Sequence, residues 1–219
     1  EIAQCLVGSE MCIRDRTSSS TLERIHLAAK AEFLEKGYQA ASLRNIVKNA
    51  GVTTGAFYGY YDSKEALFAA LVDEPYQYLM DTYRKSTMEF ERLSAGQQTM
   101  QMGESVEKSC MQELLVYMMA HRDAFHLILL CSEGTPYATL IDDLVTLEAA
   151  ATERYCEMLR RSGKQVPIID KRLEHILLTG MLSTYFEMII HDISLEDAAR
   201  YLGELNAFYT AGWLKIMGQ

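Results

Sequence analysis

The sequence predicts an all-α protein, and three observations support that fold class. The 219 residues contain only three prolines, Pro75, Pro136 and Pro167, so few positions are closed to a helix. Strand-like alternation of apolar and polar residues is scarce. Residues that begin and end helices recur along the chain instead. A chain of this length can fold as one large helical domain or as two modest ones.

The first helix is expected to begin at Ser20 and to end at Gly37. Ser20 and Glu23 have the spacing of a capping box, in which each side chain accepts from the other residue's backbone N–H. Glycine is common where a helix ends in a left-handed residue. The apolar residues that share one face of this helix are Leu22, Ile25, Ala29 and Phe33.

Two short helices, separated by Gly51, are expected next. We expect Ser42 to cap the first and Thr53 to cap the second through their hydroxyl groups. Gly51 stands where the chain leaves the first of them, a position that favours a left-handed residue. This arrangement is typical of a helix-turn-helix, which places its second helix in the major groove of DNA. The exposed side of that second helix carries Thr54, Gly55, Tyr58 and Tyr60.

The distribution of charge agrees with a DNA-binding region near the N-terminus. Residues 17–64 contain six basic and four acidic side chains, a net charge of +2. Residues 65–219 contain thirteen basic and twenty-three acidic side chains, a net charge of −10. The positive region therefore coincides with the helix-turn-helix, as contact with phosphates requires. The acidic remainder argues against binding to membranes or to polyanions in general.

Residues 20 to about 71 resemble the DNA-binding domain of the TetR/AcrR family of bacterial transcriptional regulators. The resemblance rests on residue types and spacings in Thr21–Ile25, Phe33, Gly37–Tyr38, Ser42–Ile46 and Gly51–Lys64. It covers about fifty of the 219 residues, and the rest agrees with the family only in being helical and of suitable length. Gly59 departs from the family, whose members usually carry a larger side chain beside the DNA.

The resemblance implies an organisation for the whole chain. Residues 17–64 would form a three-helix helix-turn-helix domain, and residues 65–219 a helical ligand-binding and dimerisation domain, with about nine or ten helices in total. The protein would be a cytoplasmic homodimer that needs no cofactor and binds a palindromic operator in double-stranded DNA. It would be a repressor, released when a small apolar or aromatic effector enters the second domain.

The same resemblance assigns individual residues to the DNA. The side chains expected to face the major groove are Arg44, Thr54, Gly55, Tyr58 and Tyr60. Those expected near phosphates are Ser42, Thr53 and Lys64. Phe57 and Tyr61 are expected to point inward, which leaves the other two tyrosines free for contact.

The second domain is predicted to be a series of longer helices. Ser63 starts a helix, and Pro75 is expected to open the next one, which ends near Leu93. Ser194 is a further start signal and Gly163 a stop signal. The later helices are expected over 104–119, 122–131, 136–161, 170–190 and 194–217.

The last two helices carry a pattern typical of close helix packing. Small residues recur every four positions along the final helix, at Ala199, Gly203, Ala207 and Ala211. The helix before it has small residues at Gly180 and Thr184. Such rows let another helix approach closely, either within one chain or from a second copy. The resemblance favours the second copy, so these residues are the predicted dimer interface.

The middle of the chain is rich in methionine and aromatic residues, among them Met100 and Met102. A methionine-rich wall adapts to ligands of varied shape, although such a stripe at helical spacing is usually core. A polar tip on an apolar face needs a partner, which a ligand can supply. The residues expected to line a ligand chamber are Tyr117, Phe125, His126, Met181 and Tyr185.

Residues 1–16 are expected to be a leader outside the fold. Met11–Arg16 resembles the translation of an adapter used in sequencing libraries, so the segment is either non-native or a native disordered arm. It lacks the basic start and long apolar core of a signal peptide. No apolar run approaches the roughly twenty residues of a membrane span, so no membrane contact is expected.

Catalysis and metal binding find little support in the sequence. His121 and His126 are five residues apart, which does not bring two ligands together on a helix. Cys110, Cys131 and Cys156 form no Cys-x-x-Cys pair and fit reduced core thiols. We therefore predict no catalytic and no metal-binding residues. The alternatives are a metal-responsive or activating regulator of the same class and, further away, an all-α enzyme or a protein-interaction module.

Overall fold

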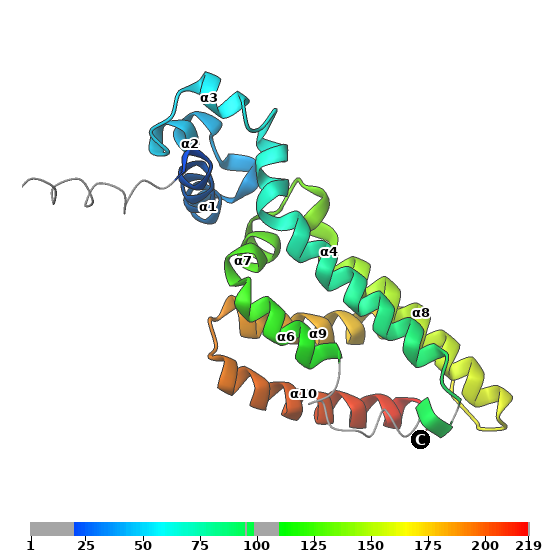
Figure 1. Ribbon diagram of the computed structural model, residues 1–219. Coiled ribbons are helices and arrows are strands. Elements are labelled where there is room, and N and C mark those ends of the chain that lie inside the picture. The colour runs from blue at the N-terminus through cyan, green and yellow to red at the C-terminus, as the bar shows by residue number, and fades with distance from the viewer. Residues whose placement is uncertain (1–19, 95, 99–109, 219) are drawn as a thin grey trace, which may run out of the picture.

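A computed structural model describes residues 20–94, 96–98 and 110–218, and over these residues the chain forms helices and no strand. The prediction of an all-α fold is confirmed. Figure 1 shows a small group of helices, α1 to α3, at one end of the molecule and longer helices at the other, with α4 running between them. The predicted leader and the expectations for Met100 and Met102 lie outside the described residues.

The first helix, α1 (Thr21–Ala40), has the predicted capping box. The hydroxyl of Ser20 accepts from the backbone N–H of Glu23 at 3.1 Å, and the Glu23 carboxylate accepts from the N–H of Ser20 at 2.7 Å. Gly37 interrupts the helix with a φ of 72°, a conformation that glycine adopts without the clash of a side chain. The predicted stop therefore marks a kink, after which the chain makes one more helical turn.

The next two helices, α2 (Leu43–Asn49) and α3 (Thr54–Tyr58), form the predicted helix-turn-helix. Gly51 has a φ of 63° between them, and the Thr53 hydroxyl accepts from the N–H of Ala56 at 3.1 Å. The expectation for Ser42 was wrong in one respect, since its side chain makes no capping hydrogen bond. The side chain of Glu32 accepts the N–H of Ser42 instead, and α2 is anchored to α1 through that contact.

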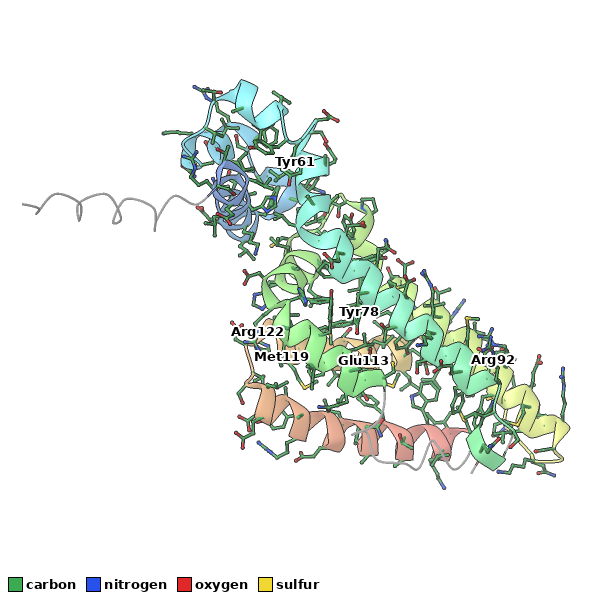
Figure 2. All side chains as sticks on the ribbon, viewed as in Figure 1. Tyr61, Tyr78, Arg92, Glu113, Met119 and Arg122 are labelled. Atoms are coloured by element: carbon green, nitrogen blue, oxygen red, sulfur yellow. The ribbon has the colours of Figure 1, made fainter. Side chains whose placement is uncertain are left out.

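Aromatic side chains from α1, α3 and the start of α4 pack together in the core of the N-terminal part. Phe33, Phe57 and Phe68 are fully buried, and the rings of Phe33 and Phe68 meet edge to face with their centroids 5.0 Å apart. Tyr61, which follows α3, forms a 2.5 Å hydrogen bond between its hydroxyl and the Nε2 of His26 on α1. The chain segment after α3, where Figure 2 labels Tyr61, is therefore fixed to α1.

One long helix, α4 (Lys64–Glu91), connects the two parts of the molecule. Its N-cap is Ser63, as predicted, and the hydroxyl accepts from the N–H of Ala66. The expectation that Pro75 opens a new helix was wrong, because Pro75 lies inside α4. Proline removes one helical hydrogen bond. Pro75 is buried together with Val72 and Leu79, so packing against the second domain carries the helix through this position.

The second domain is built from the remaining helices. The described elements are α6 (Cys110–Ala120), α7 (Arg122–Cys131), the short 3-10 helix η2 (Pro136–Thr139), α8 (Leu140–Arg161), α9 (Lys171–Ile190) and α10 (Leu195–Ile216). The described bounds of α7, α9 and α10 follow the predicted ranges closely, and Thr135 and Ser194 cap η2 and α10. The predicted helix over 136–161 begins as the 3-10 helix η2, and the start predicted at residue 104 lies outside the described residues. In Figure 1, α8 runs alongside α4, and α10 lies beyond α6 and α9.

The N-terminal helices also contact the second domain directly. Helix α1 packs against α7, and the ammonium of Lys30 lies 3.2 Å from the carboxylate of Asp123. The helix-turn-helix is thus joined to the rest of the chain at two places, along α4 and across the α1–α7 contact.

None of the described helices is by itself both long and apolar enough to cross a membrane. Helices α6 and α7 together meet the criteria of length and composition, but they are bent by 94° at the break between them.

Candidate nucleic-acid interface and ligand cavity

The outer face of the helix-turn-helix presents the side chains predicted to contact DNA. Tyr58 and Tyr60 are 53% and 50% exposed. Phe57, which directly precedes Tyr58 in α3, is fully buried. Arg44 and Thr54 are also exposed, as is Gly55. Phe57 attaches α3 to the core, while the outer face of the helix-turn-helix offers hydroxyl groups and rings from α3 and the residues after it, and one guanidinium from α2.

A buried carboxylate that the sequence analysis missed holds α2 in place. Glu32 is only 3% exposed, and one of its oxygens accepts from the N–H of Ser42 at 3.0 Å, the ammonium of Lys36 at 2.9 Å and the amide of Asn45 at 3.2 Å. The bond from the Ser42 N–H, followed by that from Lys36, lowers the pKa of Glu32. The charged carboxylate thus fixes the start of α2, next to Arg44.

Lys64 is positioned differently from its prediction. Its ammonium donates to the carbonyls of Tyr38, Ala41 and Gln39 at 2.7, 3.1 and 3.3 Å. It also lies 4.5 Å from the centre of the Tyr38 ring. These three bonds use all the N–H groups of a lysine. Lys64 therefore ties the start of α4 to the end of α1 rather than leaving a free ammonium for a phosphate.

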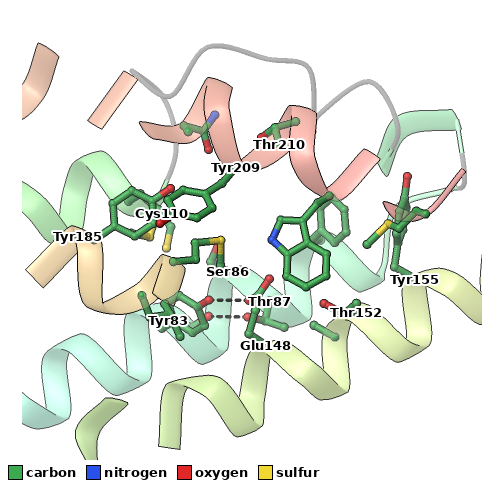
Figure 3. Close-up of a pocket in the computed structure, with 18 residues that line it drawn as sticks. Tyr83, Ser86, Thr87, Cys110, Glu148, Thr152, Tyr155, Tyr185, Tyr209 and Thr210 are labelled. Carbon is green, nitrogen blue, oxygen red and sulfur yellow. Dashed lines mark hydrogen bonds between the residues drawn. The ribbon is translucent and has the colours of Figure 1, made fainter. Parts of the chain in front are cut away.

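The second domain contains a cavity of 290 Å³ between α4, α6, α8, α9 and α10. Figure 3 shows its side chains converging from these helices, with Tyr83 and Glu148 on one side and Tyr185 and Tyr209 opposite them. The described lining residues are Tyr83, Ser86, Thr87, Phe90, Cys110, Met111, Glu148, Ala151, Thr152, Tyr155, Met181, Leu182, Tyr185, Asn206, Tyr209, Thr210, Trp213 and Met217.

Two of the five predicted chamber residues, Met181 and Tyr185, line this cavity, and the other three lie elsewhere. Phe125 is fully buried in the core. Tyr117 stacks on the ring of Tyr78 with centroids 3.7 Å apart. The Nε2 of His126 lies 2.8 Å from the carbonyl oxygen of Ile189 and so links α7 to α9. The ring of Tyr117 and the Nε2 of His126 both have contacts inside the protein, which sequence spacing could not show.

Polar residues close to Tyr117 and His126 also form hydrogen bonds within the chain. The Tyr78 hydroxyl donates to the Glu113 carboxylate at 2.8 Å, so Glu113 is occupied within the chain. Arg122 donates to the carbonyl of Ile193 at 2.7 Å and to the carboxylate of Asp192 at 3.0 Å. Figure 2 places Tyr78 and Glu113 along the line between α4 and α6, and Arg122 near Met119 at the end of α6.

The most polar point of the cavity is a contact between Tyr83 and Glu148. The Tyr83 hydroxyl donates to a carboxylate oxygen of Glu148 at 2.5 Å. Desolvation raises the pKa of the Glu148 carboxyl, and the bond from Tyr83 opposes that rise. The sequence offered a signal for this residue, because Glu148 lies four positions from both Leu144 and Thr152, which are buried residues of α8.

The predicted interface residues lie at or near the surface of the single chain. Gly180, Gly203, Ala207 and Ala211 are exposed, and Thr184 and Ala199 are half-buried. The most exposed large apolar side chains of the same helices, Phe208 at 71% and Ile176 at 64%, were not selected in the sequence analysis. A groove between α9 and α10 is lined by Thr184, Glu187, Met188, His191, Ile193, Tyr201, Glu204, Leu205 and Phe208.

In the part of the chain that the structure describes, no three side chains of histidine, cysteine, aspartate or glutamate converge as metal ligands would.

Comparison of sequences places the N-terminal region among known regulators. Residues 25–71 match the family described as "Bacterial regulatory proteins, tetR family". The HTH-type transcriptional regulator YdgC of Bacillus subtilis is 44% identical over 52 residues, which are 24% of this chain and 27% of that protein. The regulator YvdT of the same organism is 38% identical over 66 residues, 30% of this chain and 34% of that protein. These matches span only about a third or less of the relatives' own length.

Comparison of structures extends the likeness to the whole fold. SCO3833 of Streptomyces coelicolor A3, a member of the TetR transcriptional regulator family, aligns with a TM-score of 0.56 over 92% of this chain and 96% of its own, at 15% identity. A bacterial regulatory protein in the tetR family from Rhodococcus RHA1 aligns with a TM-score of 0.54 over 91% of this chain and 98% of its own, at 19% identity. The shared feature is the fold, with a helix-turn-helix at the N-terminus and helices after it.

Proposed function

Since residues 25–71 identify this chain as a member of the tetR family of bacterial regulatory proteins, we propose that it is a DNA-binding transcriptional regulator and, more specifically, a repressor that a small-molecule effector releases from its operator. The observation that carries the proposal is the α2–α3 unit, in which Tyr58 and Tyr60 are exposed beside a fully buried Phe57. The proposal includes a location in the bacterial cytoplasm, where the protein would meet its DNA partner.

In this proposal α3 enters the major groove. Thr54, Gly55, Tyr58 and Tyr60 face base edges and the sugar–phosphate walls, and Arg44 reaches from α2. The hydroxyls of Thr53 and Ser42 donate to phosphates. The Thr53 hydroxyl already accepts from Ala56 and still has its own O–H to donate, and the Ser42 hydroxyl is not used in capping. Lys64 is removed from the contact list because its ammonium is engaged with three carbonyls.

The repressor acts as a homodimer joined through α9 and α10. The exposed small residues Gly180, Gly203 and Ala207 allow a second copy to approach closely, since a side chain built at either glycine would meet open space. Phe208 and Ile176 supply the apolar area that such an interface buries. Two copies of α3 related by a two-fold axis match the two halves of a palindromic operator.

Release depends on the helix that the cavity and the DNA-reading unit share. Tyr83 and Phe90 of α4 line the cavity, and Lys64 at the other end of α4 is bonded to α1. Suppose that the ligand binds more tightly when α4 has one orientation than when it has another. Ligand binding then shifts the dimer toward the geometry in which α4 has that orientation. The separation of the two α3 helices then differs from the operator spacing, and affinity for DNA falls.

Selection of bound sequences from random DNA duplexes tests the proposal most simply. A symmetric consensus sequence with two half-sites is expected, and its affinity should fall steeply as the salt concentration rises. Retention of random duplexes without enrichment of any sequence would contradict the assignment as an operator-binding regulator.

A further inference from the structure

Among the described residues that line the cavity in the second domain, one carries a carboxylate and none carries a cationic side chain. Glu148 lines the cavity, and the described lining includes no lysine, arginine or histidine. The hydroxyl of Tyr83 is the one hydrogen-bond donor to this carboxylate recorded for the described residues. Glu148 is half-buried, and desolvation raises the pKa of its carboxyl. A negative charge that is shielded from water and bonded to a neutral hydroxyl, with no cation beside it, is costly. A cation brought into the cavity would restore the balance.

The walls around that carboxylate are unusually aromatic. The rings that line the cavity belong to Tyr83, Phe90, Tyr155, Tyr185, Tyr209 and Trp213. They come from four helices, α4, α8, α9 and α10, so they surround the space rather than forming one stripe. Aromatic faces carry partial negative charge and attract cations, above all those of low hydration such as quaternary ammonium groups. Met111 and Met181 add polarizable, adaptable surface.

From this arrangement we infer that the effector of this regulator is a lipophilic organic cation, bound between the aromatic rings with its charge next to Glu148. The inference deepens the proposed function, on which it rests, by giving the chemical class of the ligand. The 290 Å³ volume is at the small end of ligand cavities and favours a compact molecule with one or two rings.

The other classes of ligand fit the described lining less well. An organic anion would face Glu148 with no basic side chain to bind it. A neutral aromatic molecule would fill the cavity and could bond to Tyr83 or Glu148, but it would leave the carboxylate without a counter-charge. Charge therefore distinguishes the three classes when shape is held constant.

Three probes of similar size and different charge test the inference on the free protein. Benzyltrimethylammonium is the cation, neopentylbenzene is its neutral isostere, and phenylacetate is an anion of related size. Binding is measured by titration calorimetry and by the shift of the melting temperature with probe concentration. We expect the cation to bind roughly tenfold or more tightly than the neutral isostere, and the anion not to bind. Equal affinity for cation and isostere, or failure of the cation to bind, would overturn the inference without any variant.

The variant Glu148→Gln locates the effect. The amide keeps the size of the side chain and can still accept from Tyr83, so the cation should lose roughly tenfold or more in affinity while the neutral isostere changes little. Glu157→Gln is the matched control, because it removes one negative charge from the exposed side of the same helix. Unchanged cation affinity in Glu148→Gln, or an equal loss in Glu157→Gln, would count against Glu148 as the counter-charge.

Operator binding is measured separately, so that the two proposals can fail independently. Charge-selective binding with no effect on operator affinity would keep the ligand class and remove the inducible-repressor function. Operator release by neutral probes alone would keep the function and remove the ligand class.

Discussion

The two ends of α4 differ in how completely the protein satisfies its own polar groups. At the N-terminal end, the buried carboxylate of Glu32 receives hydrogen bonds from three donors, and the ammonium of Lys64 reaches three carbonyls. In the second domain, the carboxylate of Glu148 has Tyr83 as its donor and faces a cavity lined by aromatic rings. The charged groups of the first region therefore have their hydrogen-bond partners within the single chain. The carboxylate of the second region would gain a counter-charge from a cationic ligand.

This difference matches the separate tasks in the proposed function. A DNA-reading unit has to keep the positions of Arg44, Tyr58 and Tyr60 fixed, since a small displacement would break contacts to base edges. An effector site has to change its free energy when the ligand arrives, which needs unfilled space and an unbalanced charge. Helix α4 contributes residues to both regions and is the element through which one can influence the other.

The largest expected effect concerns the proposed dimer interface on α9 and α10, which forms only when two copies of the chain associate. Phe208→Glu should separate the dimer, because it places a charge where the proposed interface buries an aromatic ring. Operator affinity should then fall by about 10²- to 10⁴-fold, as each monomer binds a single half-site. Sedimentation and DNA titration measure both effects. Ile168→Glu, at a 90% exposed apolar residue outside α9 and α10, is the control and should remain dimeric.

The polar network of the N-terminal region can be broken at Glu32. Glu32→Ala leaves the N–H of Ser42 and the ammonium of Lys36 without their acceptor and should destabilise the domain by about 2–3 kcal/mol. Glu35→Ala, at an exposed neighbour on α1, should have little effect. Denaturant unfolding of both variants provides the comparison, and equal stabilities would contradict the role given to Glu32.

The same network has a defined dependence on pH. The folded state lowers the pKa of Glu32, so its contribution to stability is fully present above the ordinary glutamate pKa of about 4.3 and is lost as the pH falls below it. The difference in unfolding free energy between wild type and Glu32→Ala should therefore shrink below about pH 4.5. A difference that stays constant down to about pH 3 would show that the charge is not responsible.

The DNA-reading surface should respond in affinity rather than in stability. Tyr58→Ala removes a side chain that is 53% exposed, so the melting temperature should change little while operator affinity falls by about 1–2 kcal/mol. Met88→Ala, at an equally exposed apolar residue of α4, should change neither quantity. Undiminished operator binding by Tyr58→Ala would move the contact surface away from α3.

A substitution at Lys64 separates a structural role of this side chain from a role in binding phosphates, and it has the smallest expected effect. Lys64→Met keeps the side-chain stem but removes three hydrogen bonds, and it should lower stability by about 1 kcal/mol without changing the salt dependence of operator binding. Each lost phosphate contact would instead reduce the salt slope by about one. Lys48→Met, at an exposed lysine on α2, should leave stability unchanged.

The sequence was most informative where a structural feature depends on neighbouring residues. The capping box of Ser20 and Glu23, the left-handed Gly51 and the cap at Thr53 each act within a few residues, and all three predictions were confirmed. The helix bounds in the second domain followed for the same reason. Pro75 misled the prediction because the packing that keeps α4 continuous comes from residues distant in the sequence.

The cavity was harder to predict because five helices build it together. Met181 and Tyr185 were selected from composition, but Tyr117 and His126 belong to other contacts, with Tyr78 and Ile189. Which polar tip remains free depends on helix packing, which periodicity does not determine. Glu148 could have been found from its spacing of four positions from buried residues of α8, where a charged residue needs an explanation.

The coupling between the two regions can be measured directly by titrating operator DNA with and without saturating benzyltrimethylammonium. The account predicts that the cation weakens operator binding by wild type by roughly 5- to 150-fold, and that operator weakens cation binding by the same factor. At a cation concentration near the wild-type Kd, Glu148→Gln should lose less operator affinity than wild type, because less of it binds the cation. Saturation of the cavity with no change in operator affinity would contradict the coupling through α4.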